Sequence, residues 1–563
     1  MEREMAKDLC ITTDFADDLL RAGRHFTKGD LDAMMAFCAS LGATRHEWIF
    51  DTIWTLYDAD SPVGYDLLAV ACEAAHRHGM RFDVIYKPFE GGLELAHAAL
   101  PHTMPRPAGV PFLEEQRGIL HAVRPFVATH PEMRIARRPE DADPGGRVAA
   151  VRLVKNDDAA VSFGPDALTL LTSRRNGGFK HYEGPVSYNE ELEWRPRYPY
   201  RDHPCRVLTL GGLDLAEADR YFLIRCRKRE GPGGFVNAIE NLVELVNEDG
   251  NVIPSTPSVR PASAEGVYER LSKTVRLELS RYMRHPEVRA RLQDKEWFLA
   301  QWEGFHRFDA GWEEVCLDDG IEIAVARGKP LHNAGSLHPI YPEARQSWLE
   351  DIAFCVDRGV DGVNIRTANH NRPYEPWAYG FNEPVLERMK HRDNLGEARS
   401  INGDAYTQFL REAAELLHSK GKELGVHVHG LMLRHDDRAA NNHPFPVNFE
   451  YQWETWTREL ADYVEFRGAS FLRPENQREV TDRIGFVARE AGAPFIYQSM
   501  RDRFVVHFDG PHEALAWEME RVRRHPDVTA YNLYETANFS RMNPDTGFEG
   551  SPDIVELVRN HWR

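Results

Sequence analysis

The segment 359–384 reads GVDGVNIRTANHNRPYEPWAYGFNEP, and the rest of the chain can be interpreted from it. It opens with a short apolar run in which Val363 and Ile365 alternate with Asn364 and Arg366. This alternation is typical of a strand between a layer of helices and a polar centre. A loop rich in hydrogen-bonding and aromatic side chains follows at once. Because α/β folds place their chemistry at the carboxyl ends of parallel strands, we expect the functional site here.

The length and charge of the chain exclude several classes of protein. A chain of 563 residues is too long for one compact core, so we expect two or three domains. The net charge of −19 argues against nucleic-acid binding, which needs a basic surface, and against anionic membranes. The sequence shows neither a secretory signal nor an apolar run of membrane length, so we expect a cytoplasmic protein. Homo-oligomer formation stays open.

A regular alternation of strands and helices occupies both ends of the chain. The first part has strand patterns at 10–14, 46–52 and 81–88, separated by helical patterns at 28–41 and 65–78. From 342 onward, helical patterns precede five further strand patterns, at 361–367, 424–430, 462–468, 494–500 and 528–536. Three strands and five make eight, which predicts an α/β fold of the (β/α)8 TIM barrel type. No glycine-rich phosphate loop follows the first strand, which argues against a doubly wound sheet.

The alternation stops between the third and fourth of these strands. Short strand-like runs and turn residues such as those at 247–250 fill most of 148–257, and a helix is expected at 113–129. We therefore expect a barrel formed by 1–105 and 331–563, interrupted by an inserted domain at 106–330 that is largely sandwich-like.

Alternation along each barrel strand predicts which side chains point inward. The expected inward positions are Asn364, Arg366, His427, His429, Tyr463, Glu465 and Arg467, with Asp51 and Gln498 near the carboxyl ends of their strands and Tyr534 and Glu535 at the end of the last one. Aromatic residues, including Trp453 and Tyr534, surround this ring. Aromatic faces that cover C–H groups, together with planar polar groups that pair with hydroxyls, are typical of sugar-binding sites.

Four stretches carry a resemblance to a known family: DGVNIR at 361–366, YGFNEPVLERMKHR at 379–392, QWETWTRELADYVEF at 452–466 and YNLYETANF at 531–539. In these stretches the chain resembles the family-10-like glycosyl hydrolases, a group of (β/α)8 proteins common in bacteria. The resemblance covers 359–539 and, more loosely, the first three strands. It implies a barrel-type hydrolase that acts on carbohydrate.

Glu465 and Glu535 are the expected catalytic carboxyl pair, because glycoside hydrolysis needs one acid and one nucleophile or base. Asp51 and Asp14 are reserves near strand ends. The alternative is that Glu465 forms a structural ion pair with Arg467. The motif FNEP at 381–384 invites comparison with glycosidases, but Glu383 also fits the first turn of a helix capped by Asn382.

His427 and His429 lie on one face of a strand, which is also the arrangement of some divalent-metal sites. His370, Asp14 or Glu465 could supply a third ligand. The alternative is a pair of pocket histidines that bind substrate without metal. No cofactor is expected, and a metal-dependent hydrolase or lyase stays open as a second function.

Arg366 and His370 form a positive corner in an acidic protein. A planar guanidinium suits an anionic group on the substrate, such as a uronate carboxylate, or it balances Glu465 or Asp51. We thus expect an oligo- or polysaccharide partner that could carry an anionic group. The expected substrate-binding residues are Asp14, Arg366, His370, His427, His429, Trp453, Gln498 and Tyr534. A non-catalytic carbohydrate-binding protein is the third function that these residues allow.

Overall fold

The structure is a computed structural model. It describes residues 7–15, 18, 26–50, 65–90, 92–94, 112–116, 119–123, 126–127, 130–143, 145–154, 158–173, 180–197, 200–216, 218–226, 243–261, 321–368, 376–433, 446–467, 474–499, 511–543 and 547–562. Two compact units divide the chain, one formed by Met1–Gly91 with Ser336–Arg563 and the other by Gly92–Gly335. The expected domain boundaries at 105 and 330 stay predictions.

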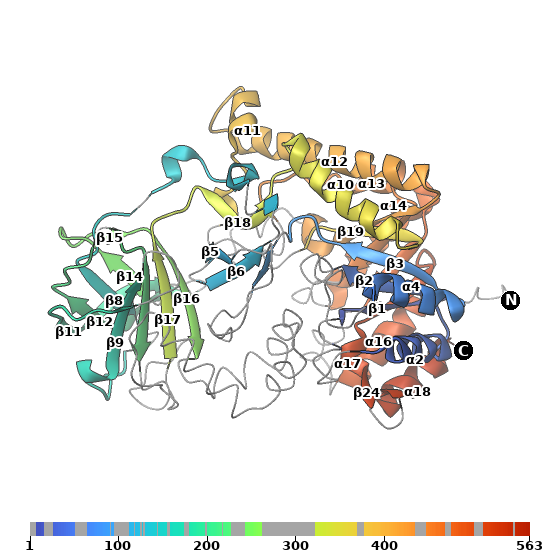
Figure 1. The fold of residues 1–563 in the computed structure, drawn as a ribbon, viewed down its shortest axis with the longest axis horizontal. Coiled ribbons are helices and arrows are strands. Elements are labelled where there is room, and N and C mark those ends of the chain that lie inside the picture. Colours follow the sequence, from blue (N-terminus) through green and yellow to red (C-terminus); the bar gives the residue numbers. More distant parts are fainter. Residues whose placement is uncertain are drawn as a thin grey trace. The chain divides into compact units, whose positions relative to one another are not determined.

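The first unit contains a closed barrel of eight parallel strands, as the sequence predicts (Figure 1). Neighbouring strands around the ring are β1 (Asp8–Thr13), β2 (Ala43–Phe50), β3 (Arg81–Tyr86), β19 (Gly362–Arg366), β20 (Glu423–His429), β21 (Tyr463–Arg467), β22 (Phe495–Gln498) and β23 (Ala530–Tyr534). The ring closes because β1 pairs with both β2 and β23.

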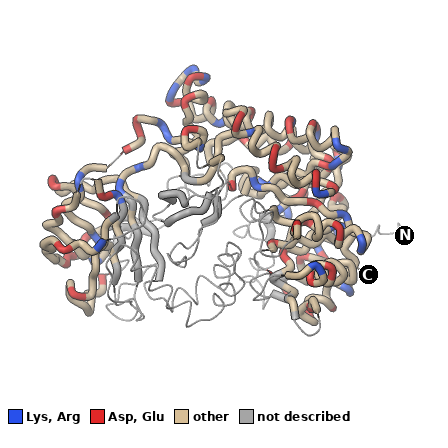
Figure 2. Tube along the Cα trace, viewed as in Figure 1, with Lys and Arg blue, Asp and Glu red and all other residues tan. Residues whose placement is uncertain are grey.

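Helices alternate with these strands in the chain and lie outside the barrel (Figure 1). They are α2 (Lys28–Ser40), α4 (Leu67–Arg77), α10 (Pro342–Val356), α11 (Glu383–Arg388), α12 (Leu395–Ser419), α13 (Trp453–Glu459), α14 (Pro474–Ala491), α16 (Pro511–Arg524), α17 (Thr536–Phe539) and α18 (Pro552–Trp562). Their charged residues of both signs are interspersed along the chain (Figure 2). Among the described helices, none has both the length and the apolar character that a bilayer span requires.

Local chemistry fixes where several of these helices begin. Thr27 and Asp30 form a capping box at α2, in which each side chain accepts a hydrogen bond from the other residue's backbone N–H. Asp66 caps α4 by accepting a hydrogen bond from the Ala69 N–H at 3.0 Å. Such caps satisfy backbone donors that the first helical turn leaves unpaired.

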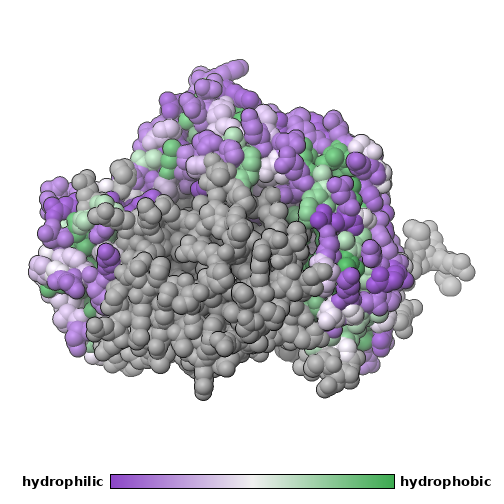
Figure 3. All heavy atoms as spheres, in the orientation of Figure 1, coloured by the Kyte–Doolittle hydropathy of each residue, from purple (hydrophilic) through white to green (hydrophobic). Residues whose placement is uncertain are grey.

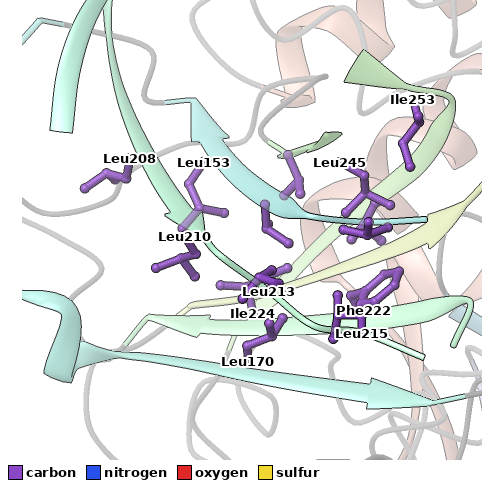
Figure 4. Close-up of a cluster of buried hydrophobic side chains, with 14 residues drawn as sticks. Leu153, Leu170, Leu208, Leu210, Leu213, Leu215, Phe222, Ile224, Leu245 and Ile253 are labelled. Atoms are coloured by element: carbon purple, nitrogen blue, oxygen red, sulfur yellow. The ribbon is translucent and has the colours of Figure 1, made fainter. Parts of the chain in front are cut away.

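The second unit contains two five-stranded antiparallel sheets that share one core. The first sheet has the order β10 (Lys180–His181), β9 (Leu168–Ser173), β13 (Tyr221–Cys226), β17 (Ile321–Arg327) and β16 (Ser255–Pro261). The second has the order β11 (Ser187–Arg197), β12 (Tyr200–Gly211), β8 (Ala150–Val154), β14 (Val243–Val246) and β15 (Val252–Ile253). Apolar side chains of both sheets pack together in this core, among them Leu153, Leu245, Phe222 and Ile224 (Figure 4).

Smaller sheets complete the described strands. They are β4 (Gly92–Glu94) with β5 (Phe112–Gln116) and β6 (Ile119–Val123), β7 (Arg134–Ala136) with β18 (His332–Leu337), and β24 (Ser540–Asn543) with β25 (Gly547–Gly550). Short 3₁₀ helices span Pro131–Met133, Pro139–Asp141, Pro165–Ala167, Pro376–Ala378 and Gly430–Leu433. Hydrophilic residues cover most of the surface coloured in Figure 3, and hydrophobic ones form separate patches.

The expectation of a helix at 113–129 is wrong. β5 and β6 occupy this stretch and pair antiparallel, with Gln116 opposite Ile119. Only Arg117 and Gly118 stand between those two residues in the sequence, and a glycine in so short a connection favours a hairpin. Apolar spacing alone did not distinguish the two structures.

Candidate functional site

The amino-terminal end of the barrel interior is closed by a buried polar cluster. The Arg45 guanidinium lies 3.0 Å from a carboxylate oxygen of Asp83 and over the Tyr463 ring at 4.2 Å. The Tyr463 hydroxyl donates to Asp83 at 3.1 Å. Arg45 and Tyr463 thus both hold the Asp83 carboxylate. Since active sites of such barrels lie at the opposite end, we assign this cluster to stability.

Two carboxyl groups face each other in the next layer, in the middle of the barrel. Glu47 of β2 and Glu465 of β21 are both fully buried and hydrogen-bonded to each other. The Asn532 amide of β23 donates to both, at 2.6 Å to each. The Asn364 amide of β19 also donates to both, at 3.2 Å to Glu47. Four strands therefore converge on one pair of acids.

Burial makes this pair hold a proton. The pKa of Glu465 is raised well above its ordinary value, first because burial disfavours the charged form and second because Glu47 is a neighbouring negative charge. Burial also raises the pKa of Glu47, but the Arg45 charge and hydrogen bonds from Asn364 and Glu465 oppose that effect. The pair therefore keeps one proton, in the hydrogen bond between Glu465 and Glu47.

Gln498 connects Glu465 to His427. The Gln498 amide nitrogen donates to Glu465 at 3.1 Å, and its oxygen lies 3.4 Å from the Nε2 atom of His427. Burial and the positive charge of Arg366 hold the pKa of His427 well below its ordinary value, so this imidazole is neutral. The Nδ1 atom of His429 accepts from the Leu431 N–H at 3.2 Å. Both histidines are thus engaged by hydrogen bonds inside the barrel.

Charged and aromatic side chains gather at the carboxyl-terminal end. Arg467 lies over the Tyr534 ring at 4.8 Å and Arg366 lies 5.8 Å from the same ring. Lys87, which follows β3, forms an ion pair with Glu90 at 3.0 Å. Glu535 follows β23 directly and keeps 7% of its surface exposed.

The segment between β19 and α12 is held by two asparagines. The Asn402 amide of α12 donates to the backbone oxygens of Gly380 and Asn448, at 2.9 and 2.7 Å. The Asn448 amide donates to the backbone oxygens of Trp377 and Tyr379, at 2.6 and 2.8 Å. These hydrogen bonds hold the backbone at Trp377, Tyr379 and Gly380, which follow β19 in the chain.

Eight of the predicted site residues fall into three groups. Arg366, His427, His429, Glu465 and Gln498 lie buried on the barrel strands, and bonds across the barrel confirm the inward direction of Asn364, His427, Glu465 and Gln498. Asp14 follows β1, and its charge acts on Lys87 and Tyr534 at the same end. Asp51 and His370 lie outside the described residues.

Two expectations take a different form in the structure. The partners of Glu465 in the described part of the chain are Glu47 and neutral amides, so the ion pair with Arg467 that the sequence allowed is not what holds it. Trp453, the first residue of α13, is buried with Arg483 of α14 over its ring at 5.5 Å. Glu383 is exposed and lies in the first turn of α11, as its structural alternative predicts, but the Asn382 side chain makes no capping hydrogen bond there.

Three important residues were not anticipated: Glu47, Asn532 and Lys87. Glu47 was missed because the second strand was expected at 46–52 with its acid at position 51, whereas β2 begins at Ala43. The signal was present, since Arg45 and Glu47 alternate with His46 and Trp48.

No metal site forms in the described ranges, since they contain no group of three His, Cys, Asp or Glu side chains arranged to hold an ion. His427 and His429 therefore lack a described third ligand, and the expected third ligand His370 is outside those ranges.

Comparisons with known proteins do not assign the chain to a family. No family model matches the chain, and no curated protein matches it. Solved structures with a related arrangement include a chitinase from Chromobacterium violaceum, at 12% identity and TM-score 0.24, covering 40% of this chain and 73% of that one. A group IV chitinase from Ostrinia furnacalis has 11% identity and a TM-score of 0.24, and the match covers 40% of this chain and 75% of that one. A curdlan-specific exo-beta-1,3-glucanase from Blastomyces gilchristii has 10% identity and a TM-score of 0.21, and the match covers 39% of this chain and 78% of that one. At such scores these likenesses support no conclusion about activity.

Proposed function

We propose that this protein is a carbohydrate-active enzyme that hydrolyses a glycosidic bond at the carboxyl-terminal end of its barrel. Glu465 and Glu535 are the proposed carboxyl pair, with Asp51 as a further acid. The proposed substrate-binding residues are Asp14, Arg366, His370, His427, His429, Trp453, Gln498 and Tyr534. The substrate is an oligo- or polysaccharide.

The observation that carries this proposal is the raised pKa of Glu465. A carboxyl group whose pKa is raised holds its proton to higher pH and can act as a general acid on a leaving oxygen. Burial supplies that shift, and Glu47 reinforces it. Glu535 supplies the second acid that glycoside hydrolysis requires, on a strand end beside the half-buried ring of Tyr534.

The proposal requires one movement. Glu465 has no exposed surface and both of its oxygens accept hydrogen bonds, from Gln498 and Asn532 on one side and from Asn364 on the other. Gln498 or His427 must therefore shift when a saccharide binds, so that the acid reaches the glycosidic oxygen. Catalytic hydrogen bonds often align only in the complex with substrate.

Turnover of a panel of oligosaccharides by four proteins tests the proposal: wild type, Glu465→Gln, Glu535→Gln and Glu47→Gln. We expect at least a hundredfold lower kcat in the first two variants, as general acid–base residues contribute on the order of 10²–10⁴-fold. Glu47→Gln is the comparison variant, because it keeps the proposed acid and removes only the charge that reinforces its raised pKa, so its loss of kcat should be smaller. Equal losses in Glu47→Gln and Glu465→Gln, at equal folded fraction, would assign the pair to structure and reject the proposal.

A non-catalytic carbohydrate-binding protein is the second candidate. The observation in its favour is that Glu465 is completely enclosed and fully hydrogen-bonded. It predicts that a saccharide raises the Tm of the wild-type protein although no product forms at any pH.

A further inference from the structure

Arg366 is a buried cation, and two of its three guanidinium nitrogens have no hydrogen-bond acceptor among the described residues. It is the last residue of β19 and has 6% of its surface exposed. Its Nε and Nη1 atoms are enclosed, and neither finds a hydrogen-bond partner. The sequence allowed Arg366 to balance Glu465 or Asp51. Glu465 is hydrogen-bonded to Glu47 and to three amides instead, and Asp51 lies outside the described residues.

Three other arginines of the described chain have an acceptor for part of the guanidinium group. Arg45 has the Asp83 carboxylate at 3.0 Å. Arg137, with 1% exposed, donates to the backbone oxygen of Pro330 at 2.9 Å. Arg327, with 9% exposed, donates to the backbone oxygen of Gly146 at 3.1 Å. An enclosed guanidinium nitrogen without an acceptor is costly, so the two unpaired nitrogens of Arg366 need an explanation.

The surroundings of Arg366 combine an aromatic ring with charges of both signs, since Asp14, Glu535 and Lys87 all act on the Tyr534 hydroxyl that Arg366 also affects. Its charge lowers the pKa of His427, and at Lys87 it opposes the raising effect of Glu90. The nearby cation Lys87 is already paired with Glu90 at 3.0 Å. The ring of Tyr534 lies 5.8 Å from the Arg366 guanidinium. A planar guanidinium beside an aromatic ring suits a flat or tetrahedral oxyanion carried on a sugar.

We propose that Arg366 binds an oxyanion of the substrate, which makes the ligand an acidic saccharide that carries a carboxylate or a sulfate ester. The proposal rests on the proposed function for the saccharide. Arg366 rather than Lys87 is the specificity-determining cation, because Lys87 has its own carboxylate. The ring of Tyr534 packs against the sugar that bears the anion.

Direct binding and thermal stabilisation test this without any need for turnover. The probes are glucuronate and galacturonate, each compared with its uncharged parent sugar, and a monosaccharide sulfate, all at one ionic strength. We expect at least one charged probe to bind the wild-type protein roughly tenfold or more tightly than Arg366→Gln, as loss of a charge-assisted hydrogen bond predicts. Arg366→Lys should lie between them. A preference for uronate or for sulfate identifies the anion.

Two features keep the test decisive. Arg366→Gln removes a cation with unpaired nitrogens, so the Tm of this variant without probe should not fall. Arg358→Gln is the matched control, because Arg358 already pairs with Asp66 at 2.8 Å and its loss should leave probe binding unchanged. Equal binding of all charged probes to wild type and Arg366→Gln overturns the proposal. Thermal stabilisation by inorganic sulfate but by none of the charged sugars also overturns it. Anion-dependent binding without turnover would reject the enzymatic function and leave the anion site intact. Turnover of neutral oligosaccharides with no preference for anionic ones would support the enzymatic function and reject the anion site.

Discussion

At the scale of single residues, the centre of the molecule is a proton shared by two acids. Glu47 and Glu465 are enclosed together and bridged by Asn364 and Asn532. Two ionised carboxylates in contact without water would repel each other strongly. The pair therefore keeps one proton, and this proton gives the barrel interior a measurable pH dependence.

The sign of that dependence follows from linkage. Burial raises the pKa of Glu465 in the folded protein well above the value of 4.5 that it has when unfolded. Between these two values the folded state holds a proton that the unfolded state has released. The free energy of unfolding therefore falls as pH rises through this window, by at most about 1.4 kcal/mol per pH unit for one proton.

Glu465→Gln should remove this slope, because an amide mimics the protonated acid. We expect its stability relative to wild type to increase from pH 5 to pH 8 in urea unfolding experiments. Glu47→Gln is the control and should be destabilised throughout, by about 1–3 kcal/mol, since its new amide donor would face the donors of Asn364 and Asn532. Parallel pH profiles for wild type and Glu465→Gln would show that Glu465 is ionised in the folded state.

At the scale of elements, glycine makes room for the polar interior. Gly425 of β20 lies against the Tyr463 ring of β21, and an added Cβ atom would collide with that ring. Because Tyr463 donates to Asp83 at 3.1 Å, its ring cannot move without loosening the amino-terminal cluster. A small residue on β20 is thus required by a large one on the neighbouring strand.

Gly425→Ala should destabilise the protein by about 1–3 kcal/mol, the usual cost of overpacking a core. The control is Gly29→Ala in the first turn of α2, where an added Cβ would meet its nearest neighbour at an ordinary 3.6 Å. It should be neutral or stabilising by up to about 1 kcal/mol. Chemical denaturation measures both, and an unchanged midpoint for Gly425→Ala would contradict the packing described.

The elements also show how far sequence patterns reach. Alternation along β19, β20 and β21 correctly placed Asn364, His427 and Glu465 inside the barrel, because the period of a strand is fixed by its geometry. The same alternation could not identify Glu47 as the partner of Glu465. Which residues meet across the barrel depends on the relative register of distant strands, and the sequence of a single strand does not specify that register. The hairpin of β5 and β6 was taken for a helix for a related reason, as pairing partners compete with local propensity.

At the scale of the whole molecule, two units have separate cores. The sandwich core includes Leu245, Leu153 and Phe222, all within the second unit. The barrel core lies within the first. Units with separate cores can unfold as separate transitions.

Leu245→Ala should lower one calorimetric transition and leave the other in place. Leu245 is fully buried, so the expected loss is about 2–5 kcal/mol for its unit. Leu410→Ala on α12, also fully buried, is the reciprocal control in the barrel unit. Equal shifts of both transitions in either variant would mean that the chain unfolds as one cooperative body.

The measurement that tests the central claim most directly is a crystal structure of Glu535→Gln soaked with an oligouronide. The account predicts density for the saccharide at the carboxyl-terminal end of the barrel, with its carboxylate on Arg366, a sugar ring against Tyr534, and Gln498 or His427 displaced towards an accessible Glu465. A saccharide bound only on the sandwich unit, or bound at the barrel with Arg366 untouched and Glu465 still enclosed, would contradict it.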